Sequence, residues 1–312
     1  MKFSTLKKTD IRISKIGLGT NAVGGHNLFS NLDENQGKEM VSHAIDKGIT
    51  FIDTADIYGK GRSEELIGEV LKTKNREDLV IATKGGNEWF EDGTVRTNNK
   101  PEYLRKAVEN SLSRLNIDYI DLYYIHFPDN ETNLADSVAE LSKLKAEGKI
   151  RAIGISNVTL EQLKEANQTG EIVALQAAYN MFERSVEKDL LPYCLENNIS
   201  FIPYGPLAFG LLGGKYTKDF RLTETDWRNS VPLFQGETFI KTLDKVEQLK
   251  DLAFIKGISL SDMALAWLLA QEGVEAVIPG GKRADHIDTN LGASDISLTK
   301  EELNAIEVIL NK

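Results

Sequence analysis

The sequence predicts a closed (β/α)8 TIM barrel of the α/β class, with a short N-terminal β-hairpin and long loops at one rim. Eight short runs rich in β-branched residues alternate with eight helical segments. Several of the short runs are almost continuously apolar, as parallel strands covered on both faces are. The length of 312 residues suits one closed barrel, so we expect residues 1–312 to form a single domain.

The first half of the chain contains four strand–helix units. Strands are expected in the runs SKIGLGT, TFIDTA, DLVIATK and YIDLYYIH, at 14–20, 50–55, 78–84 and 119–126. The helices that follow are expected at 33–47, 63–72, 100–115 and 135–148. Ser63 is expected to cap its helix with its hydroxyl, and Pro101 suits a helix opening because the N–H that it lacks would be unpaired there.

The second half of the chain repeats the pattern four more times. Strands are expected at 150–156, 172–180, 199–207 and 275–280, and helices at 159–168, 186–198, 259–271 and 284–293. The seventh unit is interrupted by a segment, roughly Phe209 to Glu237, that is typical of a long irregular insertion.

Two short glycine patterns suggest other nucleotide-binding folds. GLGTNA, from Gly17 to Ala22, matches the fingerprint of an open doubly wound sheet, but the helix that should begin inside it waits until about Asp33. GLLGGKYT resembles a phosphate-binding P-loop, but Phe209 stands at the first glycine position and Tyr216 replaces the required Ser or Thr. Neither pattern has the context that its chemistry needs, and the barrel is favoured.

Composition narrows the functional class. The net charge of 37 − 47 = −10 disfavours a nucleic-acid or anionic-membrane partner, although it allows a local basic pocket. No apolar run approaches the roughly 18 residues of a membrane span. With the single cysteine Cys194 no internal disulfide can form, and the N-terminus lacks the apolar block of a signal peptide. A cytoplasmic protein is expected.

Polar side chains stand at the carboxyl ends of the expected strands, where the chemistry of such a barrel takes place. Asp53, Lys84 and His126 end three consecutive strands, and Tyr58 lies in the loop after the first of them. Each residue alone fits a structural role, but closure of the barrel brings all three strand ends to one mouth. Further polar residues at strand ends are Ser156, Asn157, Gln176 and Tyr204.

The chemistry of this group is coherent. A tyrosine has a pKa near 10, and a nearby ammonium such as Lys84 lowers it by favouring the phenolate. Asp53 can keep Lys84 charged and oriented, and His126 can donate a hydrogen bond to a substrate oxygen. Such a set protonates an oxygen while another group attacks its carbon. We identify no nucleophile, and the four histidines are too dispersed for a metal cluster.

Seven ordered motifs carry a resemblance that covers essentially the whole chain. They are GLGT, DTADIYG, IATK, YIDLYYIH, GISN, YGPL and IPGGKR. By these motifs the sequence resembles the aldo–keto reductase family, whose catalytic tetrad maps onto Asp53, Tyr58, Lys84 and His126. GLGTNAVGGHN, GRSEELIGEVL and IHFPD are most similar to the bacterial reductases associated with inositol-utilisation operons.

The resemblance implies a hydride from the nicotinamide of NADPH and a reversible reduction of aldehydes or ketones to alcohols. Tyr58 would be the general acid in reduction and the base in oxidation, and His126 would orient the carbonyl. The dinucleotide would lie extended across the barrel mouth. The implied cofactor-binding residues are Gly19, Thr20, Asn21, Ser156, Asn157, Gln176, Tyr204, Gly205, Pro206, Leu207, Gly210, Leu212, Gly214, Lys215, Pro279, Gly280, Gly281, Lys282, Arg283, His286 and Asn290.

Four of these residues bear on cofactor choice or depart from the family pattern. Lys282 and Arg283 open the last barrel helix, where cations oppose the helix dipole unless an anion binds them. A 2′-phosphate is a natural anion for this place, so NADPH/NADP+ is expected, with NADH as the alternative. The family often has Ser where Gly205 stands, and Gln where His286 stands.

The substrate is predicted only as a small carbonyl or alcohol. Five aromatic residues are expected to wall the substrate pocket, namely Phe29, Trp89, Phe90, Phe127 and Trp227. The loops 85–100 and 209–237 hold three of them, but loop aromatics also pack loops, and substrate identity does not follow. Two other functions stay open: a sugar or polyol dehydrogenase acting oxidatively, and a regulatory barrel resembling the potassium-channel β subunits. The intact tetrad favours an enzyme, while the oligomeric state cannot be read.

Overall fold

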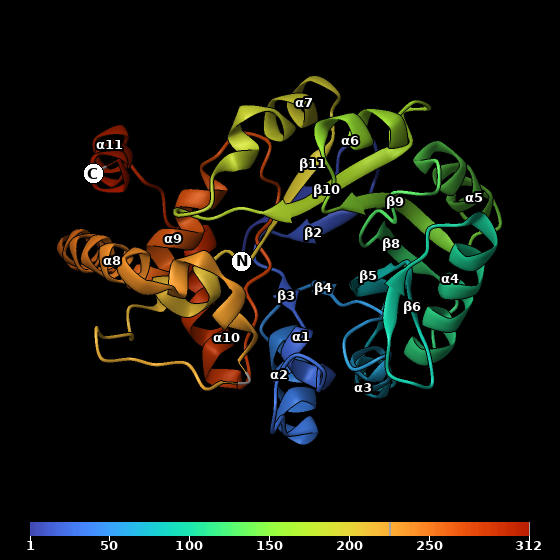
Figure 1. Cartoon of the computed structure of the whole chain (residues 1–312), viewed down its shortest axis with the longest axis horizontal. Helices are drawn as coiled ribbons and strands as arrows, with labels where there is room; N and C mark the ends of the chain where they lie inside the picture. Colours follow the sequence, from blue (N-terminus) through green and yellow to red (C-terminus); the bar gives the residue numbers. More distant parts are fainter. Residues whose placement is uncertain (225, 312) are drawn as a thin grey trace.

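A curled parallel sheet surrounded by helices forms the centre of the protein (Figure 1). The computed structural model describes residues 1–224 and 226–311. Seven strands pair in parallel in the order β3-β4-β5-β8-β9-β10-β11. Their bounds are β3 Leu18–Gly19, β4 Phe51–Asp53, β5 Val80–Gly85, β8 Ile120–Ile125, β9 Ile150–Ser156, β10 Ile172–Ala178 and β11 Ser200–Tyr204.

The eighth strand position is filled by an extended segment that closes the barrel. Val274 bridges to Phe201 beside β11, while Gly280 bridges to Gly19 of β3. Both bridges are parallel, and the N–H of Gly17 donates to the carbonyl of Val277. The predicted strand at 275–280 therefore takes its place in the ring as isolated bridges, and the (β/α)8 architecture is confirmed.

The predicted N-terminal hairpin is also present, with β1 (Phe3–Thr5) antiparallel to β2 (Arg12–Ser14). Leu6, Ile11 and Ile13 are buried in one cluster with residues of the strand interiors such as Phe51 and Leu122. A second, larger cluster joins the outer faces of the strands to the helices. The hairpin thus helps to fill the barrel interior. The polar groups at the strand ends therefore lie next to a closely packed apolar core.

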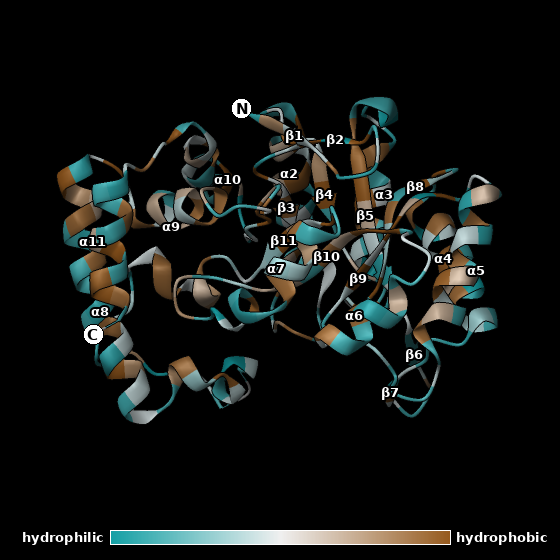
Figure 2. Cartoon of the chain, turned by 90° about the horizontal axis from the view of Figure 1, so that it is seen from above, coloured by the Kyte–Doolittle hydropathy of each residue, from teal (hydrophilic) through white to brown (hydrophobic). Residues whose placement is uncertain are grey.

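Helices follow the strands as expected, and all eight predicted helical segments form. The helices of the eight units are α2 Glu34–Asp46, α3 Arg62–Leu71, α4 Pro101–Leu115, α5 Leu134–Ala146, α6 Leu160–Ala166, α7 Leu190–Glu196, α9 Leu260–Leu269 and α10 Ala284–Asn290. A four-residue turn, α1 (Asn21–Gly24), follows β3. Figure 2 shows the first part of β5 in hydrophobic colours, and all six residues of this strand are buried, as those of a strand covered on both sides should be.

Two further helices were not part of the predicted units. The 21-residue α8 (Gly236–Lys256) ends the irregular insertion, and α11 (Lys300–Leu310) ends the chain. They lie side by side at one edge of the molecule (Figures 1 and 2). Lys256 pairs with Glu302 at one end, and Lys245 donates to the carbonyl of Leu310 at the other. No single helix within the described residues is long and apolar enough to cross a membrane; α8 and α9 meet that test only together, bent by 88°.

The prediction that Ser63 caps α3 is wrong. The helix begins one residue earlier, at Arg62, and its cap position is Gly61 with φ +97°. This left-handed conformation suits a residue without a side chain. Ser63 is instead fully buried, where its hydroxyl donates to the carbonyl of Thr20 and accepts from the hydroxyl of Thr54. A buried hydroxyl needs such partners, so Ser63 ties the helix start to the strand ends.

The close approach of β5 and β8 at Gly85 leads to a stability prediction. A Cβ on Gly85 would lie 1.8 Å from the hydroxyl oxygen of Tyr123, which has no hydrogen-bond partner among the described residues. We expect Gly85→Ala to lower the free energy of unfolding by about 1–3 kcal/mol or more through overpacking, and Tyr123→Phe to cost little. Chemical denaturation of the double mutant should recover part of the loss, because the Tyr123 ring carbon would remain 2.9 Å from the new Cβ.

Gly213→Ala is the matched control for Gly85→Ala. Nothing lies within 4 Å of a Cβ built on Gly213, so this substitution should not clash. Strictly additive effects of Gly85→Ala and Tyr123→Phe would show that the hydroxyl contact is not what excludes a side chain at Gly85.

Candidate active site

Four polar side chains meet at the carboxyl end of the barrel. Asp53 ends β4, Lys84 lies near the end of β5, and His126 directly follows β8. The backbone N–H of His126 donates to the carbonyl of Gly85, so the carboxyl ends of β5 and β8 lie side by side. Tyr58 lies in the turn between β4 and α3. Strand register thus brings together residues that are up to 73 positions apart in the chain (126 − 53 = 73).

Lys84 is at the centre of the cluster. Its ammonium donates to Asp53 Oδ1 at 2.5 Å and to the carbonyl of Thr54 at 2.8 Å. Lys84 and Asp53 are only 1% and 2% exposed. Burial alone would lower the pKa of Lys84, but the charge and hydrogen bond of Asp53 outweigh it and raise that pKa. Lys84 is therefore a permanent buried cation.

Gln176 completes the environment of Asp53. Its amide Nε2 donates to Asp53 Oδ2 at 2.9 Å, so both carboxylate oxygens of Asp53 are bonded. The family resemblance implied that Gln176 binds the cofactor. In the structure its side-chain N–H is bonded to the Asp53 carboxylate.

Tyr58 lies between Lys84 and His126. Lys84 Nζ is 5.5 Å from the centroid of the Tyr58 ring, and the His126 ring lies edge-on to it with centroids 6.2 Å apart. Burial raises the pKa of Tyr58, and the positive charge of Lys84 opposes this shift only in part. The sequence predicted the lowering effect of Lys84 but not the larger effect of burial. Tyr58 is consequently a neutral phenol at neutral pH.

His126 is also neutral. Burial, reinforced by the charge of Lys84, moves its pKa well below the ordinary range. Its Nδ1 lies 3.1 Å from the side-chain Nδ2 of Asn87, which also donates to Asp56 Oδ1 at 2.8 Å. Phe127 stacks on its ring with centroids 4.5 Å apart. The imidazole is thus held on one side by an amide and on another by an aromatic ring.

Asp56 and Asn87 were missed by sequence reasoning. Neither residue was among those that the sequence singled out. Both are buried, with 1% and 4% of their surface exposed. Burial first, and then the charge of Glu64, raises the pKa of Asp56 to about 8. An acidic residue three positions after a strand end, as Asp56 follows Asp53, was the only available signal.

A sequence model of the Aldo/keto reductase family matches residues 15–311. The chain belongs to this family. It is 37% identical to the NADH-specific methylglyoxal reductase of Escherichia coli, over 96% of this chain and 95% of that protein. It is 35% identical to an NADP(+)-labelled aldo-keto reductase of Schizosaccharomyces pombe, over 98% and 91%. The solved glycerol dehydrogenase of Gluconobacter oxydans has a TM-score of 0.92 and 36% identity, over 99% and 94%.

This aldo/keto reductase is therefore an oxidoreductase. Its family uses nicotinamide cofactors and reduces small carbonyl compounds. The named relatives differ in cofactor preference, so family membership alone leaves the choice between NADH and NADPH open.

In the segment after β11, here called the cradle, the N–H groups of Ala208, Gly210, Leu212 and Gly214 donate to carbonyls of the same segment. Its backbone is left-handed at Gly205, Ala208, Phe209, Gly210 and Gly214. Such a conformation is unfavourable for Ala and Phe, so the path is held by its surroundings. The predicted residues Pro206, Leu207 and Leu212 lie within the same segment. Contact between the cradle and a dinucleotide therefore remains a prediction from the family resemblance.

Other predicted cofactor residues line the mouth on both sides of this cradle. Tyr204 donates its hydroxyl to Asn157 Oδ1, whose amide nitrogen donates to Ser156 Oγ and to the carbonyl of His126. On the opposite side, Asn21 Oδ1 lies near Gly280, and Thr20 donates its hydroxyl to the carbonyl of Asp53. These contacts connect both rims directly to the strand ends that carry the polar cluster.

The basic residues of the eighth loop are differently engaged. Arg283 forms two hydrogen bonds with Asp285, at 2.9 and 2.8 Å. Lys282 Nζ instead lies 4.8 Å from the centre of the Phe29 ring. His286 Nδ1 accepts a hydrogen bond from the N–H of Lys282. Burial lowers the pKa of His286, Asp285 opposes this shift, and the charges of Arg283 and Lys215 add to it. The acidic partner of Arg283 was not anticipated.

The five predicted pocket aromatics divide into groups. Phe127 contacts His126, as described above. Phe29 lies edge-on to Trp227, which lies edge-on to Phe209 and has a buried indole N–H without a partner among the described residues. Trp89 and Phe90, on the hairpin formed by β6 (Asn87–Trp89) and β7 (Val95–Thr97), lie against Arg114 and Arg96. The recorded contacts thus associate Trp89 and Phe90 with loop packing.

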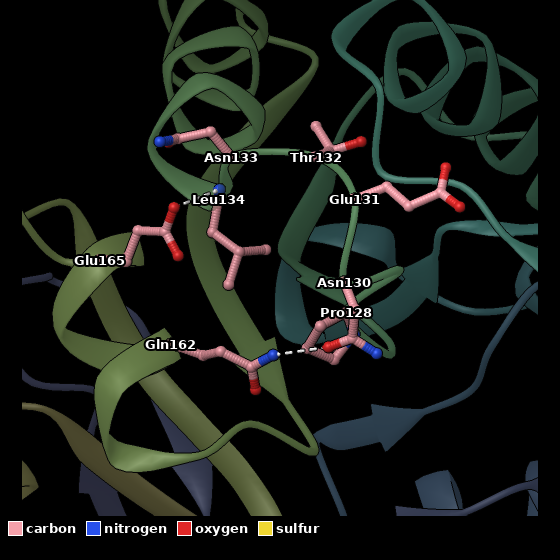
Figure 3. A pocket seen from close by; sticks show the side chains of 8 residues that line it. All are labelled: Pro128, Asn130, Glu131, Thr132, Asn133, Leu134, Gln162 and Glu165. Atoms are coloured by element: carbon pink, nitrogen blue, oxygen red, sulfur yellow. Dashed lines mark hydrogen bonds between the residues drawn. The ribbon is translucent and has the colours of Figure 1, made fainter.

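A polar pocket of about 370 Å³ opens between the loop after β8 and helix α6 (Figure 3). Asn130 accepts from Gln162 across it, and Glu165 accepts from the N–H of Leu134 at its other side. None of the four clustered residues lines it. No group of three or more metal-ligating side chains occurs within 1–224 and 226–311.

The buried Asp56 leads to a prediction about stability and pH. In the unfolded chain this carboxyl ionises near pH 4, but in the folded protein only near pH 8. Between these values the folded state binds more protons, so stability falls as the pH rises. Asp56→Asn removes this cost. Its free energy of unfolding relative to wild type should rise between pH 5 and pH 8, by on the order of a few kcal/mol.

Urea denaturation at several pH values measures this difference. Asp10→Asn is the control, because the Asp10 side chain is 89% exposed and therefore lacks the burial that penalises a charge on Asp56. A flat or falling difference for Asp56→Asn would show that Asp56 ionises normally in the folded protein.

Proposed function

We propose that this chain reduces small aldehydes and ketones with NADPH, and that Tyr58 supplies the proton. The main support for this proposal is the position of the buried Lys84 ammonium, which is bonded to Asp53 and lies against the Tyr58 ring. A bound dihydronicotinamide supplies the hydride to the carbonyl carbon. The phenol of Tyr58 gives its proton to the carbonyl oxygen, and the product is the alcohol.

Each residue of the cluster has a distinct part in this step. Neutral His126 donates a hydrogen bond that orients and polarises the carbonyl oxygen. The charge of Lys84 stabilises the phenolate that forms as Tyr58 loses its proton. Asp53 holds Lys84 in place and keeps it charged. In the reverse direction Tyr58 as phenolate would accept the alcohol proton, so one relay serves both directions.

The proposed NADPH preference rests on Lys282 and Arg283. Both are at the start of α10, beside the loop that ends the barrel. Lys282 makes no recorded ion pair within the described residues, and Arg283 is bound to Asp285. A 2′-phosphate would have to draw Arg283 away from Asp285 or share it. We therefore propose a moderate preference for NADPH, with NADH also used.

Oxidation of a polyol is a second candidate function. It is favoured by the likeness to a solved glycerol dehydrogenase over nearly the whole chain. The motif likeness to bacterial reductases associated with inositol-utilisation operons points to the same hydroxylated substrates. Assays of NADP+ and NAD+ reduction with glycerol and cyclic polyols would test it. A cytoplasmic location remains a prediction from the sequence.

Tyr58→Phe tests the proton donor. We expect kcat for aldehyde reduction to fall by about 10²–10⁴-fold, the usual contribution of a general acid, while the fluorescence titration with NADPH stays unchanged. Tyr123→Phe is the control, since it removes another buried hydroxyl from the same barrel. Full activity of Tyr58→Phe at neutral pH would refute this role.

The cofactor proposal is tested on the eighth loop. Lys282→Ala with Arg283→Ala should raise the dissociation constant for NADPH by about tenfold or more, through loss of charged hydrogen bonds, and barely affect NADH. Asp285→Asn should do the opposite, tightening NADPH several-fold, because Arg283 is released and a negative charge is removed. Equal changes in the dissociation constants for NADPH and NADH would show that Lys282 and Arg283 do not bind the 2′-phosphate.

A further inference from the structure

We propose that Asn87 and Asp56 are positioning residues that hold His126 in the tautomer carrying its proton on Nε2. The proposal rests on the function above, in which His126 donates a hydrogen bond to the substrate oxygen. It assigns a role to two buried residues outside the four-residue cluster. It also explains how the imidazole is prevented from presenting a lone pair to that oxygen.

The hydrogen bonds of Asn87 determine the tautomer. Its side-chain nitrogen has two hydrogens and two neighbours, His126 Nδ1 at 3.1 Å and Asp56 Oδ1 at 2.8 Å. A neutral imidazole has one N–H and one accepting nitrogen. If Nδ1 accepts from Asn87, the proton must be on Nε2. The N–H of His126 then faces away from Asn87 and is free for a substrate.

Both supporting residues are held firmly. Asn87 begins β6 and pairs with Thr97, and its carbonyl accepts from the Tyr103 hydroxyl at 2.5 Å. The N–H of Asp56 donates to the carbonyl of Lys84 at 2.9 Å. The two residues are therefore anchored to β5 and its hairpin, and the amide has little freedom to turn. A positioning residue needs this rigidity, because a loosely held partner would not select one tautomer.

The Asn87 amide, which lies between Asp56 and His126, changes which nitrogen of the histidine carries the proton. A carboxylate in direct contact with a histidine Nδ1 accepts a hydrogen bond from the Nδ1–H and stabilises the imidazolium, which lets the histidine act as a base at Nε2. Here Asn87 stands between the carboxyl of Asp56 and the ring. Nδ1 becomes an acceptor, and the histidine becomes a donor at Nε2. Tyr58 is then left as the group that transfers the proton.

The surroundings of Asp56 keep this chain of hydrogen bonds neutral at physiological pH. Burial and the charge of Glu64 raise the pKa of Asp56 to about 8. Glu64 is itself fully buried and accepts from Arg114 and from Thr83. The titratable groups that act on Asp56, or on which it acts, are Glu64 of α3, Arg114 and Tyr103 of α4, Tyr58, Lys84 of β5 and Tyr123 of β8.

The decisive variant exchanges the two residues. In Asp56→Asn with Asn87→Asp, composition and shape are conserved, but a carboxylate now faces His126 Nδ1 and the amide lies behind it. The proton should move to Nδ1, or the ring should become charged. Asp56→Asn alone is the matched control, because its amide oxygen can still accept from Asn87, and it should keep the Nε2–H tautomer.

Nitrogen NMR of histidine-labelled protein at pH 7 reads the tautomer directly, and His126→Gln identifies the signal among the four histidines. We expect Nε2–H in wild type and in Asp56→Asn, and its loss in the exchanged variant. We expect kcat for aldehyde reduction in the exchanged variant to be at least about tenfold below that of Asp56→Asn, the usual effect of a misplaced supporting residue. NADPH affinity, measured by fluorescence, should be equal in the two.

Nδ1–H in the wild-type spectrum would overturn the proposal whether or not the exchanged variant folds. An exchanged variant that folds and keeps both Nε2–H and the kcat of Asp56→Asn would also overturn it. The outcome is separable from that for the proposed function. An Nε2–H signal in a protein that reduces no aldehyde would support the positioning of His126 and reject the reductase mechanism.

Discussion

The buried ion pair between Lys84 and Asp53 is the interaction on which the rest of the site depends. Two charges removed from water are costly, and they persist only where good geometry and further hydrogen bonds satisfy them. Here the Thr54 carbonyl accepts a second hydrogen bond from Lys84, and the Gln176 amide donates a second hydrogen bond to Asp53. The pair therefore joins β4, β5 and β10 across the barrel interior. The same contacts that make the cation tolerable also fix where it can act.

The buried ammonium of Lys84 influences the protonation states of the side chains around it. His126 is kept neutral by burial and by Lys84, while burial keeps Tyr58 a phenol. In the mechanism we propose, these residues separate three tasks that one residue could not combine: a fixed charge, a neutral donor and a removable proton. The second acidic group, Asp56, is joined to His126 only through an amide. Its carboxyl group is therefore not a direct hydrogen-bond partner of the imidazole.

The loops add a different kind of recognition to this rigid centre. A left-handed backbone path after β11 and the basic residues of the eighth loop lie on either side of the strand ends. In the function proposed above, they would hold an extended dinucleotide without the helix-borne glycine turn of a doubly wound sheet. The strand ends would then provide the chemistry and the loops the choice of cofactor, and two relatives of this chain do differ in their named cofactors.

The sequence alone determined the barrel and the convergence of Asp53, Lys84 and His126. Alternating strands and helices allow few closed arrangements, and closure brings consecutive strand ends to one mouth. Only the tertiary structure decided that Ser63 is a buried link, that Arg283 is bound by Asp285, and that α8 lies beside α11. It also decided that Asn87 lies between Asp56 and His126, and that at Tyr58 the effect of burial on the pKa outweighs that of Lys84. These outcomes depend on which distant side chains become neighbours and how much water they lose, and neither quantity is encoded in residue spacing.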